Sequence, residues 1–175
     1  MNNDQSLHDF LRNAAYLSGV RRYLEVGCRE GDSLRQIVAN SSMLDRIVVC
    51  DMWGPMYGGT GRGGHDHIDA MLNGFAYTGE RLFLDGDSKE LVPTLREEFD
   101  LVLVDGDHSQ AGALADLTNC WPLVESKGQL VFHDIIHPAH RELMVVFMEF
   151  MSRQTDCAGI KTILEGHGVA VAWKK

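Results

Sequence analysis

Carboxylates and imidazoles recur along the chain at the ends of short apolar runs, where ligand-binding side chains are often placed. Glu25 closes one such run and Asp51 the next, and further polar groups follow at residues 85–88, 105–108 and 133–134. In an open parallel sheet, ligands bind beyond the carboxyl ends of the strands. If these runs are parallel strands, each delivers at least one carboxylate to a common rim that can bind a polar ligand.

The turn after the first apolar run carries two glycines four residues apart. The stretch 21–31 reads RRYLEVGCREG, and Asp32 and Ser33 open the next predicted helix. Gly27 and Gly31 allow the backbone to pass close to a bound molecule, and a helix N-terminus attracts polar ligand groups. The turn is therefore expected to hold a nucleotide-like cofactor. A tight strand–helix turn without a ligand is the structural alternative.

A second group of candidate residues follows the fourth and fifth runs. It contains Asp105, Asp107, His108, His133 and Asp134. Carboxylates and imidazoles at neighbouring strand ends could hold a divalent ion, and a set rich in oxygen favours magnesium or manganese. Without a metal, His108 or His133 could act as a general base, because histidine titrates near neutral pH. In the structural alternative, His108 starts a helix and His133 hydrogen-bonds a neighbouring loop.

The elements that would position these residues alternate between strand and helix patterns. Apolar residues at helical spacing predict a leading helix over 6–18, with Ser6 as N-cap, that packs against the edge of the sheet. Ser33 and Gln36 have the spacing of a capping box at the next helix. Strands are expected over 21–26, 47–50, 81–84, 99–104 and 129–132, and the helices between and after them contain residues 34–38, 68–75 (closed by Gly79), 91–95, 114–117 and 143–151.

The end of the chain has a different pattern, which completes the predicted fold. Residues 161–164 and 169–173 read as two strands joined by a short link with glycines, as is typical of an antiparallel hairpin. The five preceding strands alternate with helices, as parallel neighbours require. We therefore predict an α/β fold with a Rossmann-like, doubly wound, mostly parallel seven-stranded sheet and an antiparallel C-terminal hairpin. A single domain is expected to span residues 1–175.

Composition and charge argue against several classes of function. The chain of 175 residues has no apolar run approaching the roughly 18 to 20 residues that a membrane helix needs. Its first residues lack the basic start and apolar core of a secretory signal, so a cytoplasmic location is expected. A net charge of -9 without a cluster of Lys and Arg argues against a nucleic-acid partner. The four cysteines form no CxxC pair and are expected to be free thiols.

The motifs, taken in order, resemble a known family. The stretch LEVGCREG (24–31) is similar to the cofactor-binding motif of class I S-adenosylmethionine-dependent methyltransferases, in which an acidic residue precedes a GxxxG turn. The stretches FLDGDSKELVP (83–93), FDLVLVDGDHS (99–109) and GQLVFHDI (128–135) resemble in particular the small-methyltransferase group of macrocin-type sugar O-methyltransferases and cephalosporin-hydroxylase-like proteins. With Asp51 and the closing hairpin, the resemblance covers nearly the whole chain.

The resemblance implies roles for the residues of the rim. The two glycines would let the backbone approach the methionine moiety, Glu25 would orient that turn or reach the ammonium group, and Asp51 would accept both ribose hydroxyls. Asp85 and Asp87 could also be turn and N-cap residues, which aspartate favours. The implied cofactor-binding residues are Glu25, Gly27, Gly31, Asp51, Asp87 and Ser88 (near the adenine) and Asp105 (beneath the sulfonium).

A metal ion is also implied by the resemblance. Several relatives orient the acceptor hydroxyl with a divalent ion, at the positions that match Asp105, His133 and Asp134. The chain departs from some relatives at His133, where they place a second carboxylate. The implied cofactors are therefore S-adenosylmethionine and, as in those relatives, Mg²⁺ or Mn²⁺.

The predicted function is methyl transfer from S-adenosylmethionine to a small-molecule acceptor, with a hydroxyl oxygen as the expected target. A nicotinamide-dependent oxidoreductase is one alternative, but its GxGxxG fingerprint requires glycine where this chain has Arg29. A non-catalytic methyltransferase-like binding domain is the other, because no long insertion is present. The glycine-rich loop 52–67 is the candidate lid, and a homodimer could supply another. The sequence does not identify the acceptor.

Overall fold

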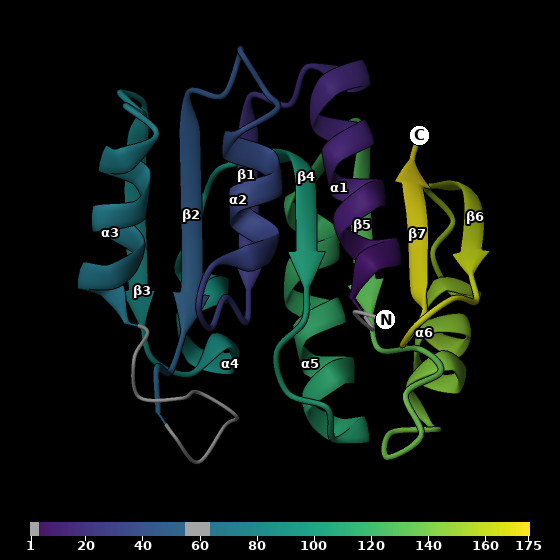
Figure 1. Ribbon diagram of the computed structural model, residues 1–175. Coiled ribbons are helices and arrows are strands. Elements are labelled where there is room, and N and C mark those ends of the chain that lie inside the picture. Colours follow the sequence, from purple (N-terminus) through teal and green to yellow (C-terminus); the bar gives the residue numbers. More distant parts are fainter. Residues whose placement is uncertain (1–3, 55–63) are drawn as a thin grey trace.

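Seven strands of the described chain form one sheet, in the order β3-β2-β1-β4-β5-β7-β6 (Figure 1). This computed structural model describes residues 4–54 and 64–175. Strands β1 to β5 pair in parallel, whereas β7 runs antiparallel to both β5 and β6. The predicted mostly parallel sheet with an antiparallel hairpin is confirmed. The strands are β1 (Arg22–Val26), β2 (Arg46–Asp51), β3 (Glu80–Asp85), β4 (Phe99–Val104), β5 (Val124–His133), β6 (Cys157–Ile163) and β7 (Val169–Lys174).

The register of the parallel strands brings their carboxyl ends to one edge of the sheet. Val26 is paired with Cys50 on one side and with Val104 on the other. Asp51 at the end of β2 is paired with Asp85 at the end of β3. The polar residues that follow these strands therefore meet at a common rim, as the sequence predicts.

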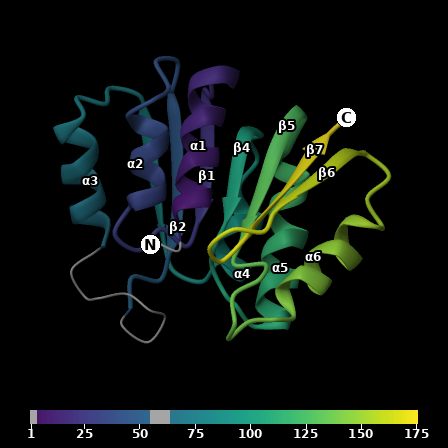
Figure 2. The same cartoon turned by 45° about the vertical axis from the view of Figure 1, so that its right-hand side comes forward.

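Helices cover both faces of the sheet, as Figure 2 shows. Alternate strand residues point to opposite faces: Tyr23 packs in a buried cluster with α1, α2 and α3, and Leu24 packs in a second cluster with α5 and α6. Both faces are thus apolar and covered, which is typical of parallel sheets. The helices are α1 (Gln5–Ser18), α2 (Asp32–Val38), α3 (His65–Gly74), α4 (Ser88–Leu91), α5 (Gln110–Cys120) and α6 (Leu143–Met151).

The leading helix α1 lies on a face of the sheet, so its predicted position at the sheet edge is wrong. Leu7 and Leu11 are fully or almost fully buried. They belong to the same apolar cluster as Leu101 of β4, Val131 of β5 and Val171 of β7. The amphipathic stripe of this helix indicates that one side is buried, but the stripe does not say which part of the sheet covers it.

Three local predictions about helix ends are also wrong. The N-cap of α1 is Asp4, and Ser6 donates its hydroxyl hydrogen bond to the Glu165 carbonyl. Helix α3 ends at Gly74, five residues before Gly79, and leaves Phe75 with 41% of its surface exposed. The capping box proposed for Ser33 does not form, because α2 begins after Gly31 in the left-handed conformation and the Ser33 hydroxyl bonds to Glu25.

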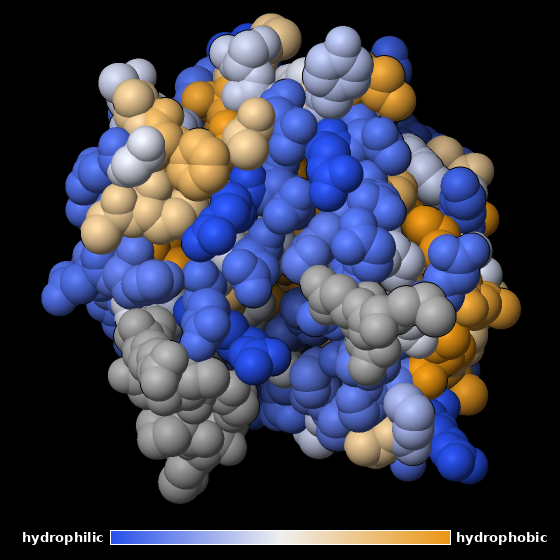
Figure 3. Space-filling model, viewed as in Figure 1, coloured by the Kyte–Doolittle hydropathy of each residue, from blue (hydrophilic) through white to orange (hydrophobic). Residues whose placement is uncertain are grey.

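The face of the molecule that carries α1, α2 and α3 is largely covered by hydrophilic side chains, with hydrophobic ones gathered towards its margins (Figure 3).

Within residues 4–54 and 64–175, no helix combines the length and the apolar character needed to cross a membrane. The four cysteines are free thiols, as predicted.

Candidate functional site

The turn between β1 and α2 requires glycine at position 27 for two reasons. Gly27 has a φ of 84°, in the left-handed region that favours glycine. A Cβ atom placed on Gly27 would lie 2.0 Å from the carbonyl oxygen of Asp105. The turn is held in place by hydrogen bonds from the Gly27 amide to the Cys50 carbonyl and from the Asp105 amide to the Val26 carbonyl. The glycine therefore lets two strand ends approach each other closely at the rim.

Asp51 fixes the conformation of the same turn from the end of β2. Its Oδ2 atom accepts hydrogen bonds from the backbone amides of Cys28 and Arg29, at 2.7 and 2.9 Å. Its Oδ1 atom accepts one from the amide of Trp53 at 2.6 Å. Arg29 has a positive φ of 50°, which costs free energy in a non-glycine residue. The Asp51 carboxylate thus stabilises the strained start of the turn while facing the rim.

Glu25 lies beneath the turn, in the interior of the protein. Its side chain is completely buried and accepts a hydrogen bond from the Ser33 hydroxyl on α2. Burial raises the pKa of Glu25 to about 8. This placement favours the expected role of orienting the turn over direct contact with a cofactor ammonium group.

The raised pKa of Glu25 predicts a pH-dependent stability. The folded protein keeps a proton on Glu25 between about pH 4.5 and pH 8, whereas the unfolded chain releases it. The contribution of Glu25 to the free energy of unfolding is complete below pH 4.5. It falls as the pH rises to 8, by at most about 1.4 kcal/mol per pH unit. Glu25→Gln, which stays neutral, should remove this slope and be more stable than the wild type at pH 8.5.

Urea unfolding of both proteins at pH 5, 7 and 8.5 measures the difference in slope. Glu90→Gln is the matched control, because Glu90 is exposed on α4 and its loss should leave the pH dependence unchanged. Equal slopes for the wild type and Glu25→Gln would show that Glu25 is already ionised in the folded protein at neutral pH.

A cavity of about 470 Å³ opens at the rim where the strand ends meet. Its volume lies in the range of about 300–1,000 Å³ that small-molecule sites occupy. Among the described residues, six aspartates line it together with Arg29, Lys89 and five histidines. Of the predicted site residues, Glu25 and Gly31 are absent from its lining. The lining contains the others: Gly27, Asp51, Asp87, Ser88, Asp105, His108, His133 and Asp134.

Asp87 and Ser88 border the cavity at the start of α4. Asp87 is the N-cap, and its Oδ1 atom accepts a hydrogen bond from the Lys89 amide at 2.9 Å. The N-cap alternative for Asp87 is therefore confirmed, and its role at the adenine stays a prediction. Ser88 donates its hydroxyl hydrogen bond to Asp116 on α5.

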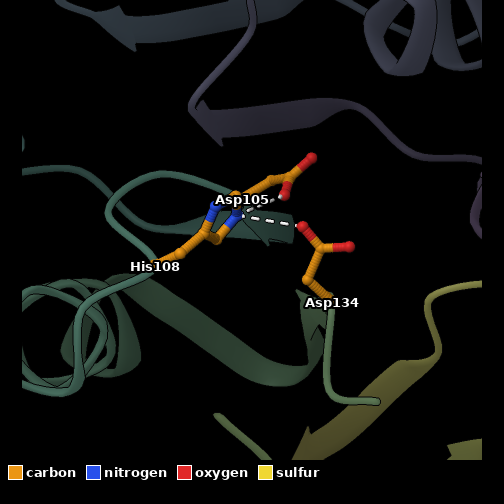
Figure 4. A group of neighbouring side chains, drawn as sticks. All are labelled: Asp105, His108 and Asp134. Carbon is orange, nitrogen blue, oxygen red and sulfur yellow. Dashed lines mark ion pairs between the residues drawn. The ribbon is translucent and has the colours of Figure 1, made fainter. Parts of the chain in front are cut away.

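Three ionisable side chains at the ends of β4 and β5 point towards one another (Figure 4). One ligand atom from each of Asp105, His108 and Asp134 lies within 4.8 Å of the others. The Nε2 atom of His108 is 3.0 Å from Asp134 Oδ2 and 3.5 Å from Asp105 Oδ1. The arrangement can hold a divalent cation or stabilise a proton on the imidazole.

Charge interactions in this group shift its pKa values in opposite directions. Contact with Asp105, and then with Asp134, raises the pKa of His108 to about 10. Burial by itself would raise the pKa of Asp105, but the opposing effects of His133 and His108 outweigh it and lower that pKa to about 2. His108 is therefore a cation at neutral pH in the metal-free site, which weakens its candidacy as a general base.

Comparison with known proteins shows the family to which this chain belongs. A family model described as a methyltransferase domain matches residues 24–135, which is more than half of the chain. The chain belongs to this methyltransferase family. The match begins at the strand before the glycine turn and ends just beyond Asp134, so it contains most of the rim. The predicted class I S-adenosylmethionine-dependent methyltransferase is confirmed, and this result disfavours the nicotinamide-dependent alternative.

Solved methyltransferases share the fold at low sequence identity. PaMTH1 from Podospora anserina, determined with S-adenosylhomocysteine, is 15% identical with a TM-score of 0.73, covering 96% of this chain and 78% of that one. The O-methyltransferase TomG from Streptomyces achromogenes is 19% identical with a TM-score of 0.72, over 97% and 80% of the two chains. The N-methyltransferase NodS from Bradyrhizobium japonicum is 16% identical with a TM-score of 0.67, over 99% and 87%. No curated protein matches the sequence.

His133 of the methyltransferase is almost completely buried, with 4% of its surface exposed. Its Nδ1 atom lies 3.2 Å from Asp105 Oδ1, and it is not part of the three-residue set described above. Burial lowers the pKa of His133, but the charge and hydrogen bond of Asp105 outweigh this effect, so the net shift is upward. The predicted metal set of Asp105, His133 and Asp134 is thus close in space, and His108 lies near the same two carboxylates, at 3.5 and 3.0 Å.

Several residues of the methyltransferase rim were not singled out from the sequence. Asp116 on α5 is buried and ties Ser88 to the loop after β4, because its carboxylate also accepts from the Asp107 amide. In the sequence, the signal for a buried Asp116 was its position among the apolar residues of one helix face. His137, His140 and His167 line the cavity beside His108 and His133. His137 and His140 lie three residues apart in the loop after β5, whereas His167 comes from the link between β6 and β7.

Asp85 lies outside the cavity lining and binds the loop after β2. It accepts a hydrogen bond from Trp53 Nε1 at 2.8 Å and contacts His65 Nδ1 at 3.1 Å. Its expected role as a structural residue agrees with these contacts. Most of the candidate lid loop, residues 55–63, lies outside the described residues.

Proposed function

We propose that this methyltransferase moves the methyl group of S-adenosylmethionine to a hydroxyl oxygen of a small-molecule acceptor. The observation that carries the proposal is the cavity at the strand ends, lined by the Gly27 turn and the Asp51 carboxylate in a chain of the methyltransferase family. The O-methyltransferase fold neighbour supports a hydroxyl acceptor. The N-methyltransferase neighbour has the same fold, so the fold alone does not select oxygen.

The rim residues suggest an orientation for the cofactor. The methionine end would lie against the turn at Gly27, the ribose hydroxyls at Asp51, and the adenine near Asp87 and Ser88. Asp105 would lie beneath the sulfonium. The six aspartates of the cavity outnumber Arg29, Lys89 and the protonated His108, which favours a cationic ligand over an anionic one. Methyl transfer is a direct displacement, so the protein has mainly to align the acceptor oxygen, the methyl carbon and the sulfur and to exclude water.

The carboxylates beyond the sulfonium position fit a divalent ion. Asp105 and Asp134 face the same point, with an imidazole beside them. Such an ion, when bound, orients the acceptor hydroxyl and favours its ionised form. Without an ion, His133 or His108 would have to accept the acceptor proton, and His108 would first have to lose its own, because its pKa is raised to about 10.

Calorimetric titration with S-adenosylmethionine and S-adenosylhomocysteine tests the cofactor assignment. Both should bind with dissociation constants below about 1 mM, the range of ordinary enzyme substrates, and NADH should not bind. The absence of binding by either sulfur compound at millimolar concentration would contradict the proposal.

Three broader expectations accompany the function. A cytoplasmic location is supported by four free cysteines, which are typical of reducing compartments. A small-molecule acceptor, and not nucleic acid or a membrane, is supported by the acidic cavity. A homodimer that completes the acceptor site is the third expectation, and size-exclusion chromatography with light scattering would test it.

A further inference from the structure

We propose that the site at the ends of β4 and β5 takes a divalent transition-metal ion of the manganese-to-zinc series in preference to magnesium, with Asp105, His108 and Asp134 as its ligands. The inference deepens the divalent-ion part of the proposed function and rests on it. It differs in the third ligand, which is His108 and not His133, and in the identity of the metal.

The two distances from His108 to the carboxylates match those around a small cation, and the two carboxylate atoms lie within 4.8 Å of each other. An ion about 2.1 Å from each ligand places neighbouring ligands about 3.0 Å apart in octahedral and about 3.4 Å apart in tetrahedral geometry. The Nε2 atom of His108 is 3.0 Å from the Asp134 carboxylate and 3.5 Å from the Asp105 carboxylate. Only small movements are therefore needed for all three groups to bind one ion.

The backbone holds these ligands in place before any ion binds. Asp105 directly follows β4 and Asp134 directly follows β5, two strands that are paired through Val104 and Phe132. Asp134 is 7% exposed and has a φ of 60°, a left-handed conformation that is costly for a non-glycine residue. Its buried Oδ1 atom lies 3.2 Å from His167 Nδ1 and 3.6 Å from His133 Nδ1, and its Oδ2 atom faces His108. A buried carboxylate kept in a strained backbone conformation is typical of a functional site.

His108 is anchored next to the start of α5. The following residue, Ser109, is the N-cap of this helix and accepts a hydrogen bond from the Gly112 amide at 3.0 Å. Asp107 instead points towards Lys89, with Oδ2 3.5 Å from Nζ. The loop thus presents the imidazole, and not the neighbouring carboxylate, to Asp105 and Asp134 (Figure 4).

The chemistry of this donor set favours a transition metal. Magnesium prefers an octahedron of oxygen ligands and keeps several waters. Imidazole suits zinc, copper, iron and nickel, while carboxylates also accept manganese. Three protein ligands with further positions left open are typical of catalytic sites. All three residues line the cavity, so the open positions face the space where the acceptor would bind.

His133 has a positioning role in this arrangement. Its Nδ1 atom contacts Asp105 Oδ1 at 3.2 Å from a buried position. Groups that orient a ligand in this way typically contribute about 10–100-fold to metal affinity. Loss of His133 should therefore weaken binding of every ion by a similar factor, whereas loss of His108 should change the selectivity.

Calorimetric titration of the chelator-treated protein with Mg²⁺, Mn²⁺ and Zn²⁺ tests the proposal without turnover. One Mn²⁺ or Zn²⁺ per chain should bind at least about 100-fold more tightly than Mg²⁺. His108→Asn should weaken Mn²⁺ and Zn²⁺ binding by about 100-fold or more and change Mg²⁺ binding much less. Co²⁺ absorption provides a second readout, because its visible bands should lose intensity or shift when the imidazole ligand is removed.

His67→Asn is the matched control, because His67 is exposed on α3 and lies outside the cavity lining. It should leave metal affinity unchanged. The proposal is overturned if Mg²⁺ binds as tightly as Mn²⁺, if no ion binds, or if His133→Asn and not His108→Asn abolishes the selectivity. S-adenosylhomocysteine binding is measured on the same samples. If it persists while no metal binds, this inference fails and the methyltransferase assignment stands.

Discussion

Alanine at position 27 should abolish binding of S-adenosylhomocysteine and destabilise the fold by about 3 kcal/mol or more. The left-handed conformation of Gly27, with φ of 84°, costs a residue with a Cβ about 1–2 kcal/mol. In addition, the new methyl group would lie 2.0 Å from the Asp105 carbonyl oxygen and 2.5 Å from its carbon. These are backbone atoms, so relief of the clash must displace the end of β4 and distort the cavity.

Urea unfolding and calorimetric titration measure the two effects of Gly27→Ala. The control is Gly74→Ala, because a Cβ on Gly74 would meet no atom within 4 Å and alanine favours the helix by about 1 kcal/mol. Gly74→Ala should bind the ligand normally and be at least as stable as the wild type. If Gly27→Ala behaved like Gly74→Ala, the close approach of the two strand ends would not be needed for cofactor binding.

Asparagine at position 51 should lower the affinity for S-adenosylhomocysteine by about 100-fold. Two effects add. The amide would lose charge-assisted hydrogen bonds to the ribose hydroxyls, which contribute about 1.5–3 kcal/mol each. Asparagine would also accept the hydrogen bonds of the Cys28 and Arg29 amides less strongly. In the wild type these bonds, of 2.7 and 2.9 Å, go to a charged carboxylate. The second effect should lower the free energy of unfolding by about 1–2 kcal/mol.

Titration and urea unfolding of Asp51→Asn should be compared with Asp45→Asn. Asp45 precedes β2 and forms an exposed ion pair with Arg21 at 2.7 Å. Such surface pairs contribute less than about 1 kcal/mol, so the control should bind the ligand as the wild type does. Undiminished affinity in Asp51→Asn would mean that the ribose lies elsewhere, even if the turn itself were weakened.

The sheet and its rim could be predicted because both follow from local patterns. Apolar runs closed by Glu25 or Asp51 indicate buried strands, and the parallel topology places their ends on one edge. Most of the predicted rim residues accordingly line one cavity. The two exceptions are Glu25, which lies within β1, and Gly31, which ends the turn before α2. Alternation along β1 turns Glu25 into the sheet interior, where it bonds to Ser33.

The remaining features depend on tertiary contacts that no spacing encodes. The stripe of Leu7 and Leu11 predicts a buried helix face but does not distinguish the edge of the sheet from its centre. Ser33 has the spacing of a capping residue, yet a buried carboxyl group nearby is a stronger partner than the helix end. His140 and His167 reach the cavity from separate loops. The single-domain boundary and the roles of individual site residues stay predictions.

The geometry of the Asp105, His108 and Asp134 group changes one expectation in particular. The sequence suggested His108 and His133 as equivalent candidates for a base. In the structure, both imidazoles lie near the two carboxylates. His108 Nε2 is closer to Asp134, at 3.0 Å, whereas the almost completely buried His133 is closer to Asp105, at 3.2 Å. Their surroundings therefore separate the two histidines into a candidate ligand and a positioning residue, a distinction that depends on side-chain direction and not on sequence order.

A crystal structure of the protein with S-adenosylhomocysteine is the most direct test of the account. The ligand is expected in the cavity at the strand ends, with its amino-acid end against the Gly27 turn and its ribose hydroxyls on the Asp51 carboxylate. Its sulfur should face the Asp105, His108 and Asp134 group. A ligand bound elsewhere on the protein, or a cavity without ligand density in crystals grown at a concentration that saturates the protein in solution, would contradict it.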